Sequence, residues 1–274
     1  MVLKLRFPRN AYPIPIKEYE GYKSSYGWWP GSPTNILPRF TKSSVGASNF
    51  CPQQYFIKYP LGVKEPENDN MIRGTNVHDA VEQFYHDVDL KIIDELNGVA
   101  PNSDIHQLHK YFMSLIPNMD LYELGEEEHI RKYLLAEAMR AADCDLDLFL
   151  PVGNEITLHG VVEIQDQKIH LTGMIDRLFV DNEGGYHVHE LKTGVFNPKK
   201  DRKWEHMRQE LAYYVFLMKH CDNKLYDRDN NVIGELPLNT SSVSWWGWDH
   251  TGGDGIFRGK ESVRTREWDS CLGV

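Results

Sequence analysis

The sequence predicts a mixed α/β fold in which helices cover a sheet. Two observations predict it. Apolar residues recur with helical spacing in the first half of the chain, and from about residue 155 they alternate with polar residues, as in strands. The short sequences QDQ and NEGG separate the expected strands, and short links favour antiparallel hairpins. The expected order is helices, three strands, a helix and a strand.

The composition fits a single globular domain over residues 1–274. Hydrophobic residues make up 41% and charged residues 26% of the chain, which are ordinary values for such a domain. The first part, 1–72, is rich in Pro, Gly and aromatic residues, and we expect loops and short helical turns there. Helices are expected over 73–150, a sheet with one helix over 151–250, and a polar tail over 251–274.

The first strong helix is expected to begin near Arg73, because apolar residues follow the spacing of one helix face. Those residues are Val77, Ala80, Val81, Phe84, Tyr85 and Val88. Two further helical stretches are expected at about 103–117 and 126–149. The second half then predicts the strands EITLHGVVEI, KIHLTGMIDRLFVD and GYHVHELKT, a helix at about 202–220, and the strand SSVSWWGWD.

Charge and cysteine content narrow the class of protein. The formal net charge of −10 argues against a protein that coats nucleic acid non-specifically, because neutralising phosphates requires Lys and Arg. No segment has the roughly 20 apolar residues that span a bilayer, and the start lacks the apolar run of a signal peptide. The four cysteines are scattered without a C-x-x-C pair, which suits reduced thiols. We therefore expect a cytoplasmic (intracellular) protein with no membrane partner.

An acid and a base share one face of the third expected strand. Glu190 and Lys192 occupy alternate positions, and Asp176 lies late in the neighbouring strand. Side chains on one face of adjacent strands lie about 5 Å apart, so two buried carboxylates there would repel each other. A divalent cation such as Mg²⁺ removes that repulsion. The plainer alternative is an ion pair or a solvent-facing edge.

Three sequence motifs carry a resemblance to a known family. Asp176 is followed by Glu190-Leu191-Lys192; the sequence RGTNVHDAVE contains His78 and Glu82 one turn apart; and QELAYY follows on the next helix. In order and spacing, these motifs resemble the PD-(D/E)XK nuclease superfamily, and in particular its RecB-like exonuclease branch. The resemblance covers residues 73 to 214. It implies a restriction-endonuclease-like αβββαβ core with a mixed sheet and an N-terminal helical region.

The resemblance also implies a role for each matching residue. Asp176 and Glu190 would bind the catalytic metal, with the carbonyl of Leu191 as a third ligand, and His78 would bind the same ion or a second one. Lys192 would orient or activate water, or stabilise the phosphorane. The implied cofactors are one or two Mg²⁺ or Mn²⁺ ions. Taken alone, a histidine such as His78 on an amphipathic helix is more often a residue on the flank of the helix than a metal ligand.

Substrate contacts are expected around the helix that follows the third strand. By resemblance, Gln209 and Tyr213 would shape the site and contact the DNA backbone; alternatively they form a satisfied core pair. The run NPKKDRKWEHMR concentrates positive charge directly after the active-site strand. Its Lys199, Lys200 and Arg208 are candidate phosphate contacts, or alternatively a solvated face. Glu155, which opens the first strand, is a looser candidate for an outer acid.

The cysteines set this chain apart from iron–sulfur relatives. The CRISPR-associated RecB-like nucleases resemble it but carry four cysteines for a cluster, one before the core and three after it. Cys51 resembles the first, whereas only Cys221 and Cys271 follow the core, fifty residues apart. Four thiolates hold such a cluster. We therefore expect no iron–sulfur cluster.

Together these features predict a metal-dependent DNA nuclease that hydrolyses phosphodiester bonds with metal-activated water. By resemblance it would be an exonuclease on DNA ends or single strands in repair, recombination or processing, with a helicase or recombination partner. One alternative is a metal-dependent endonuclease of the same fold. Another is a non-catalytic DNA-binding scaffold, against which the intact Asp176, Glu190 and Lys192 argue. No oligomeric state is predicted.

Overall fold

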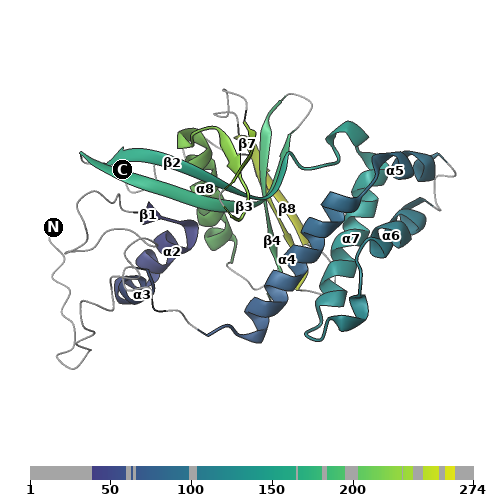
Figure 1. The fold of residues 1–274 in the computed structure, drawn as a ribbon, viewed down its shortest axis with the longest axis horizontal. Helices are drawn as coiled ribbons and strands as arrows, with labels where there is room; N and C mark the ends of the chain where they lie inside the picture. Colours follow the sequence, from purple (N-terminus) through teal and green to yellow (C-terminus); the bar gives the residue numbers. More distant parts are fainter. Residues whose placement is uncertain are drawn as a thin grey trace.

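The prediction of a mixed α/β fold is confirmed by the computed structural model, in which helices and one sheet form separate layers (Figure 1). The structure describes residues 39–59, 63, 66–98, 104–164, 166–180, 184–194, 203–229, 231–236, 243–252 and 257–262. Within these ranges eight strands form one sheet, with seven of them in the order β6-β5-β2-β3-β4-β7-β8.

Three long strands form the centre of the sheet: β2 (Gly153–Ile164), β3 (Gln167–Val180) and β4 (Tyr186–Lys192). Both neighbouring pairs are antiparallel, as the short connections predicted. The next strand, β7 (Val243–His250), runs parallel to β4, which makes the sheet mixed. The expected central strands and their last partner therefore lie where the alternating pattern placed them.

The strands at the two ends of the sheet were not predicted. They are β5 (Lys224–Tyr226), β6 (Val232–Glu235) and β8 (Phe257–Ser262). The two-residue strand β1 (Arg39–Phe40) pairs in parallel with β3. The polar tail expected from residue 251 is wrong in part, because β8 pairs with β7 there. The sequence FRGKES has one apolar residue and no alternation, so its pairing depends on the neighbouring strand rather than on local pattern.

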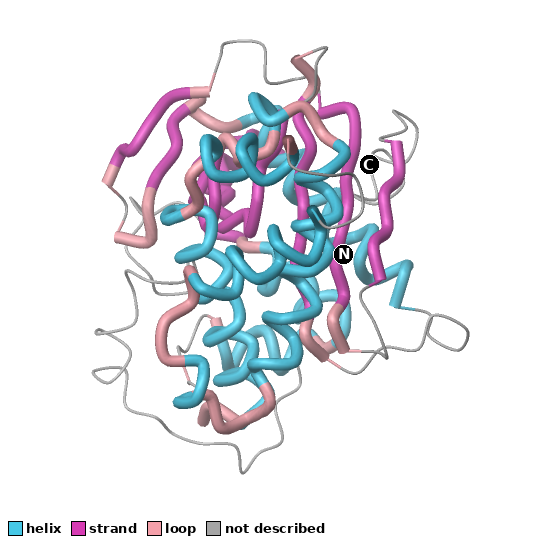
Figure 2. The backbone as a smooth tube through the Cα atoms, turned by 90° about the vertical axis from the view of Figure 1, so that its right-hand side faces the viewer, coloured by secondary structure: helices cyan, strands magenta, loops and turns pink. Residues whose placement is uncertain are grey.

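Four helices form a layer of their own, seen on the right of Figure 1 and in front of the strands in Figure 2. They are α4 (Asp69–Asp87), α5 (Leu90–Asn97), α6 (Asp104–Ser114) and α7 (Glu126–Asp143). Their apolar faces share one core, to which Leu191 of β4 also belongs. The expected helix over 126–149 ends earlier, at Asp143, and a 3₁₀ turn follows at Leu146–Leu148.

A second core lies between the sheet and α8 (Lys203–His220). Leu211, Val215 and Met218 of α8 are buried with Ile175 and Val188 of the central strands. Gly173 of β3 allows this close approach, because a Cβ atom there would lie 3.0 Å from the ring of Tyr214. This packing brings α8 directly over the strands that carry Asp176 and Glu190.

The N-terminal part of the described chain contributes α2 (Lys42–Phe50) and α3 (Pro52–Lys58). Thr41 caps α2 in a reciprocal capping box with Ser44, which fixes where the helix begins. Pro52 begins α3, a position that suits its missing N–H. Residues of α2 contact α8, so this segment lies next to the central strands.

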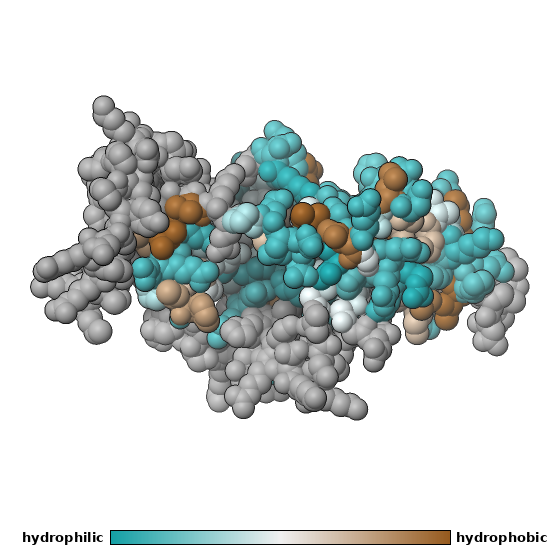
Figure 3. Space-filling model, turned by 90° about the horizontal axis from the view of Figure 1, so that it is seen from below, coloured by the Kyte–Doolittle hydropathy of each residue, from teal (hydrophilic) through white to brown (hydrophobic). Residues whose placement is uncertain are grey.

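The described surface is largely polar. On the face shown in Figure 3, hydrophobic side chains lie in small separate groups among hydrophilic ones. Scattered exposed apolar residues of this kind are normal for a globular domain. Among the described residues, no helix combines the length and the apolar character that crossing a bilayer requires.

Candidate metal centre

Three carboxylates lie in a row across the central strands. Asn154 pairs with Arg177 between β2 and β3, and Arg177 pairs with His189 between β3 and β4. Continuing these registers places Glu155 on one side of Asp176 and Glu190 on the other. All three residues are buried, with 2% to 6% of their surface exposed. Asp176 therefore has an acidic neighbour on each adjacent strand.

His78 reaches this row from the middle of α4. Its Nδ1 lies 2.7 Å from Oε1 of Glu155, and its Nε2 lies 3.8 Å from Oδ2 of Asp176. Donor atoms of His78, Glu155 and Asp176 all lie within 4.8 Å of one another, close enough to share one metal ion. Imidazole nitrogen and carboxylate oxygen both bind divalent metals. The predicted convergence of His78 and Asp176 is thus present, and Glu155 joins them.

The backbone of Leu191 is part of the same cluster. Its N–H donates a 2.6 Å hydrogen bond to Oδ2 of Asp176, and its carbonyl oxygen lies 3.2 Å from Nε2 of His78. The carbonyl thus lies beside the candidate ligands, where the sequence motif suggested a third ligand. Its role as a ligand stays a prediction.

Glu155 adopts an unusual backbone conformation. Its φ is +50°, a left-handed value that is uncommon for a residue other than glycine. Such strain costs free energy and is often found at functional sites. Oε2 of Glu155 lies 3.6 Å from the guanidinium of Arg228, which also pairs with Asp79 at 2.8 Å and Glu82 at 2.9 Å. Arg228 thus supplies positive charge on the outer side of the cluster.

Glu190 has different partners from Glu155 and Asp176. Its Oε1 accepts hydrogen bonds from the ammonium groups of Lys42 and Lys192, the latter at 2.6 Å. Both lysines also pair with Oε2 of Glu210 on α8, Lys192 at 3.1 Å and Lys42 at 3.5 Å. The other oxygen of Glu190, Oε2, is buried and has no hydrogen-bond partner among the described residues.

These surroundings move the pKa values of the two central acids in opposite directions. Burial and the nearby charge of Glu190 raise the pKa of Asp176 to about 6. Burial would also raise the pKa of Glu190, but the positive charges of Lys192 and Lys42 and their hydrogen bonds outweigh it and lower that pKa to about 2. Glu190 is thus held as a carboxylate, whereas the positive charges of His78 and Lys42 do not offset burial at Asp176.

The basic groups are held in their charged forms. Burial alone would lower the pKa of His78, but the charge of Asp176 and the hydrogen bond to Glu155 outweigh it and raise the pKa above its ordinary value. In the same way, burial would lower the pKa of Lys42 and Lys192, but the charges of Glu190, Glu210 and Asp176 together outweigh it and raise both pKa values. In the protein without metal, His78 therefore provides the positive charge closest to Asp176.

The donor set fits a divalent cation. A buried carboxylate oxygen without a donor is costly, and Oε2 of Glu190 has no donor within the part of the chain that the structure describes. The positive charges of His78 and Lys42 do not offset burial and the acids beside Asp176, so its pKa stays raised. Carboxylate and carbonyl oxygens together with one imidazole nitrogen are ligands that bind divalent cations. The residues that would hold the ion are His78, Glu155 and Asp176, with Oε2 of Glu190 and the Leu191 carbonyl at the edge of the cluster.

Three of the five predicted substrate contacts lie on α8. Gln209 and Arg208 are exposed, whereas Tyr213 is buried, with its hydroxyl 2.8 Å from the carbonyl of Phe40 and 2.9 Å from that of Thr172. Tyr213 thus ties β1 to β3. Contact of these three side chains with DNA stays a prediction. Lys199 and Lys200 lie outside the described residues.

Sequence patterns missed three charged residues of the site: Lys42, Glu210 and Arg228. Lys42 and Glu190 are 148 residues apart, and Arg228 and Asp79 are 149 apart, so only the folded chain brings them together. Glu210 had a signal, because it lies between the two matching residues of QELAYY. Glu155 was expected as an outer acid, yet it lies among the candidate metal ligands.

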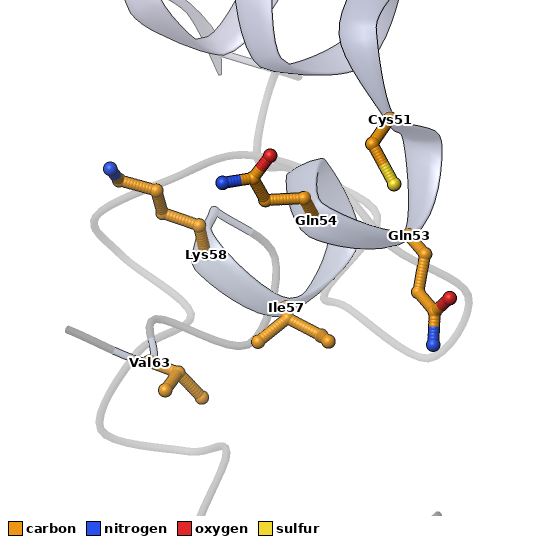
Figure 4. A pocket seen from close by; sticks show the side chains of 6 residues that line it. All are labelled: Cys51, Gln53, Gln54, Ile57, Lys58 and Val63. Atoms are coloured by element: carbon orange, nitrogen blue, oxygen red, sulfur yellow. The ribbon is translucent and has the colours of Figure 1, made fainter. Parts of the chain in front are cut away.

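A separate cavity of about 330 Å³ lies beside α3 and lacks carboxylates (Figure 4). Its lining residues are Cys51, Gln53, Gln54, Ile57, Lys58 and Val63. Cys51 is a free, half-buried thiol, as are Cys144 and Cys221, whereas Cys271 lies outside the described residues. The expectation that the protein holds no iron–sulfur cluster stays a prediction.

A sheet with carboxylates in register, a histidine from a neighbouring helix and a lysine two residues beyond the last acid defines a class of metal-dependent nucleases. A family model for the PD-(D/E)XK nuclease superfamily matches residues 39–259. The chain belongs to the PD-(D/E)XK nuclease superfamily. The resemblance of its motifs to the RecB-like branch is consistent with this membership.

Individual proteins add little to this assignment. No curated protein matches the sequence. One matching solved structure is named "Crystal structure of SSO0001". It is 13% identical and the match covers 74% of this chain and 84% of that chain, with a TM-score of 0.33. Similarity at that level bears on neither the fold nor the function.

Proposed function

We propose that this protein is a Mg²⁺- or Mn²⁺-dependent deoxyribonuclease formed by one nuclease domain. The observation that carries the proposal is the row of Glu155, Asp176 and Glu190 with His78 at one end and Lys192 at the other. Acidic ligands for a cation lie beside a positively charged group, an arrangement suited to a reaction in which negative charge develops on phosphate.

Each residue has a distinct part in the proposed reaction. His78, Glu155 and Asp176 would bind one metal ion, and Glu190 would contribute its Oε2, which has no hydrogen-bond partner in the described ranges. When bound, such an ion supplies Lewis-acid stabilisation and a more acidic water. Lys192, with 32% of its side chain exposed, faces the substrate side and stabilises the negative charge of the phosphorane. These assignments follow from the geometry and the family motifs together.

We also propose exonucleolytic action on DNA ends or single strands, in repair, recombination or processing. The support is the resemblance of RGTNVHDAVE and QELAYY to the RecB-like branch. The same resemblance supports a helicase or recombination partner. Gln209, Tyr213 and Arg208 on α8, with Lys199 and Lys200 before it, would contact or position the DNA backbone. The alternatives are endonucleolytic action at the same site and a scaffold without activity.

The test is cleavage of end-labelled linear and circular DNA, single- and double-stranded, in Mg²⁺, Mn²⁺ or EDTA. An exonuclease degrades linear substrates, spares circular ones, and stops in EDTA. Asp176→Asn, purified in the same way, is the matched control for contaminating nucleases. Cleavage of circles would establish the endonuclease, whereas equal cleavage by wild type and Asp176→Asn, or none in any metal, would refute the proposal.

A further inference from the structure

A second lysine reaches the proposed active site from α2. The ammonium group of Lys42 donates a hydrogen bond to Oε1 of Glu190 and lies 3.5 Å from Oε2 of Glu210. Its side chain is 16% exposed, half the value of Lys192. A buried lysine is rare unless it is paired. Lys42 thus belongs to the interior of the site, while Lys192 lies nearer to solvent.

The backbone around Lys42 is held in place on both sides. The Ser44 N–H donates a 3.1 Å hydrogen bond to Oγ1 of Thr41, and the Ser44 hydroxyl donates a 2.9 Å hydrogen bond to the Thr41 carbonyl. The carbonyl of Phe40 accepts from the hydroxyl of Tyr213 at 2.8 Å. Lys42 is the first residue of a capped helix and follows a paired strand. Its position is therefore set by packing.

Lys42 changes the charge balance around Lys192. Two lysines, Lys42 and Lys192, face two acids, Glu190 and Glu210, and each lysine contacts both acids. Without Lys42, Lys192 alone of this pair of lysines would contact the carboxylates of Glu190 and Glu210. Lys192 would then be held more tightly in its pair with Glu190, because a single cation would carry the whole attraction.

We propose that Lys42 is a positioning residue: it holds Glu190 and neutralises part of its charge, so that Lys192 is free to contact a substrate phosphate. The role of Lys192 in this statement rests on the proposed nuclease function. Lys42 itself acts through Glu190 and Lys192. Its close contact with Glu190 Oε1 leaves the other oxygen, Oε2, without a partner among the described residues.

Metal titration tests the charge role without requiring activity. Lys42→Met removes the positive charge and keeps a long apolar side chain. We expect Mn²⁺ to bind it roughly threefold or more tightly than wild type, because a like charge near the ligands is gone. Lys42→Arg should bind Mn²⁺ as wild type does. The matched control is Lys91→Met, on the exposed face of α5, which should leave Mn²⁺ affinity unchanged.

Single-turnover cleavage tests the positioning role. We expect Lys42→Met to lower the rate constant roughly 10- to 100-fold with little change in DNA binding, the scale of a small displacement in an active site. Lys42→Arg should restore most of the rate. In the Lys192→Ala background, Lys42→Met should have little further effect, because the two residues act in one chain of contacts.

The outcomes separate this proposal from the nuclease function. If wild type cleaves DNA and Lys42→Met cleaves it at the same rate, the positioning role is overturned. It is also overturned if the rate losses of Lys42→Met and Lys192→Ala multiply in the double variant. Loss of both Mn²⁺ affinity and thermal stability would show a purely structural lysine; Lys42→Gln is the second variant if Lys42→Met does not fold. If wild type cleaves no DNA, the proposed nuclease function fails. If Lys42→Met then also binds Mn²⁺ with the affinity of wild type, the charge role of Lys42 is overturned as well.

Discussion

Asp176 and Glu190 lie across from each other on neighbouring strands, yet their surroundings differ in charge. Asp176 has Glu155 and Glu190 beside it, and the positive charges of His78 and Lys42 offset only part of the effect of these acids and of burial. Glu190 has two lysines on one oxygen. The pKa of the first acid is raised to about 6, and that of the second is lowered to about 2. Burial is similar at both positions, so the neighbouring charges cause the difference.

The contrast indicates how one row of acids can serve two purposes. Acidic pairs whose pKa values diverge are frequent in active sites, where environment assigns each a separate role. On the Asp176 side, positive charge does not offset burial and the neighbouring acids, so this side gains most from a bound cation. The Glu190 side is already neutralised and holds the lysines in place. We therefore expect a substitution near Asp176 and a substitution near Glu190 to have different effects on metal binding, cleavage and stability.

The largest expected effect follows from removing Lys192. Lys192→Ala takes away a cation and leaves the candidate ligands intact, so metal affinity should persist or increase. Cleavage should nevertheless fall by roughly 10² to 10³-fold, the loss seen when one preorganised stabilising group is removed. Calorimetric metal titration with single-turnover cleavage measures both quantities. Wild-type cleavage by Lys192→Ala would mean that the lysine only pairs with Glu190 and Glu210.

Neutralising the two acids in turn should shift stability in opposite directions. Glu190 has a lowered pKa, so above its unfolded value its charge stabilises the fold, and that contribution is lost as the pH falls through about 2. Asp176 has a raised pKa, so its charge destabilises the metal-free fold above about pH 6. At pH 7 in EDTA, Glu190→Gln should lower the free energy of unfolding by on the order of 2–3 kcal/mol. Asp176→Asn should raise it by a similar amount.

Urea unfolding with and without Mn²⁺ measures these shifts. Wild type should be stabilised by Mn²⁺, because a ligand that binds only the folded state stabilises it. Asp176→Asn should lose that stabilisation together with its cleavage activity. Shifts of the same sign for Asp176→Asn and Glu190→Gln in EDTA would contradict the view that opposite local charge separates the two acids.

Local sequence motifs identified the residues of the site that lie on α4, β3 and β4. Asp176, Glu190 and Lys192 were visible because strand alternation puts them on one face, and His78 because its helix matches a family motif. The central strands were predicted for the same reason: their side chains alternate. Lys42 and Arg228 could not be predicted, because each reaches its acidic partners across nearly 150 residues. Likewise β5, β6 and β8 are short strands at the two ends of the sheet, and their formation depends on pairing rather than on their own patterns.

The pH dependence of metal binding tests the roles of Asp176 and His78 as ligands. Metal binding requires Asp176 as a carboxylate and one deprotonated nitrogen on His78, and the pKa of each is raised in the metal-free protein. Protons therefore compete with the ion. Mn²⁺ affinity should fall by about tenfold for each pH unit below about 6, with a further loss from His78. Titrations in buffers of different ionisation enthalpy measure proton release on binding. Affinity that stays constant from pH 5 to 8 would contradict the assignment of both ligands.

The smallest expected effect concerns Arg228, the cation on the outer side of the cluster. Arg228 is 43% exposed and pairs with the exposed Asp79 and Glu82 as well as with Glu155. Exposed ion pairs contribute only about 0.2–1 kcal/mol, and salt screens them. Arg228→Gln should therefore tighten Mn²⁺ binding by less than about fivefold at low salt, and the difference should disappear near 0.5 M salt because the Debye length is then only about 4 Å. A large loss of Mn²⁺ affinity would instead mean that Arg228 holds Glu155 in its left-handed conformation, so that geometry rather than charge dominates on this side of the site.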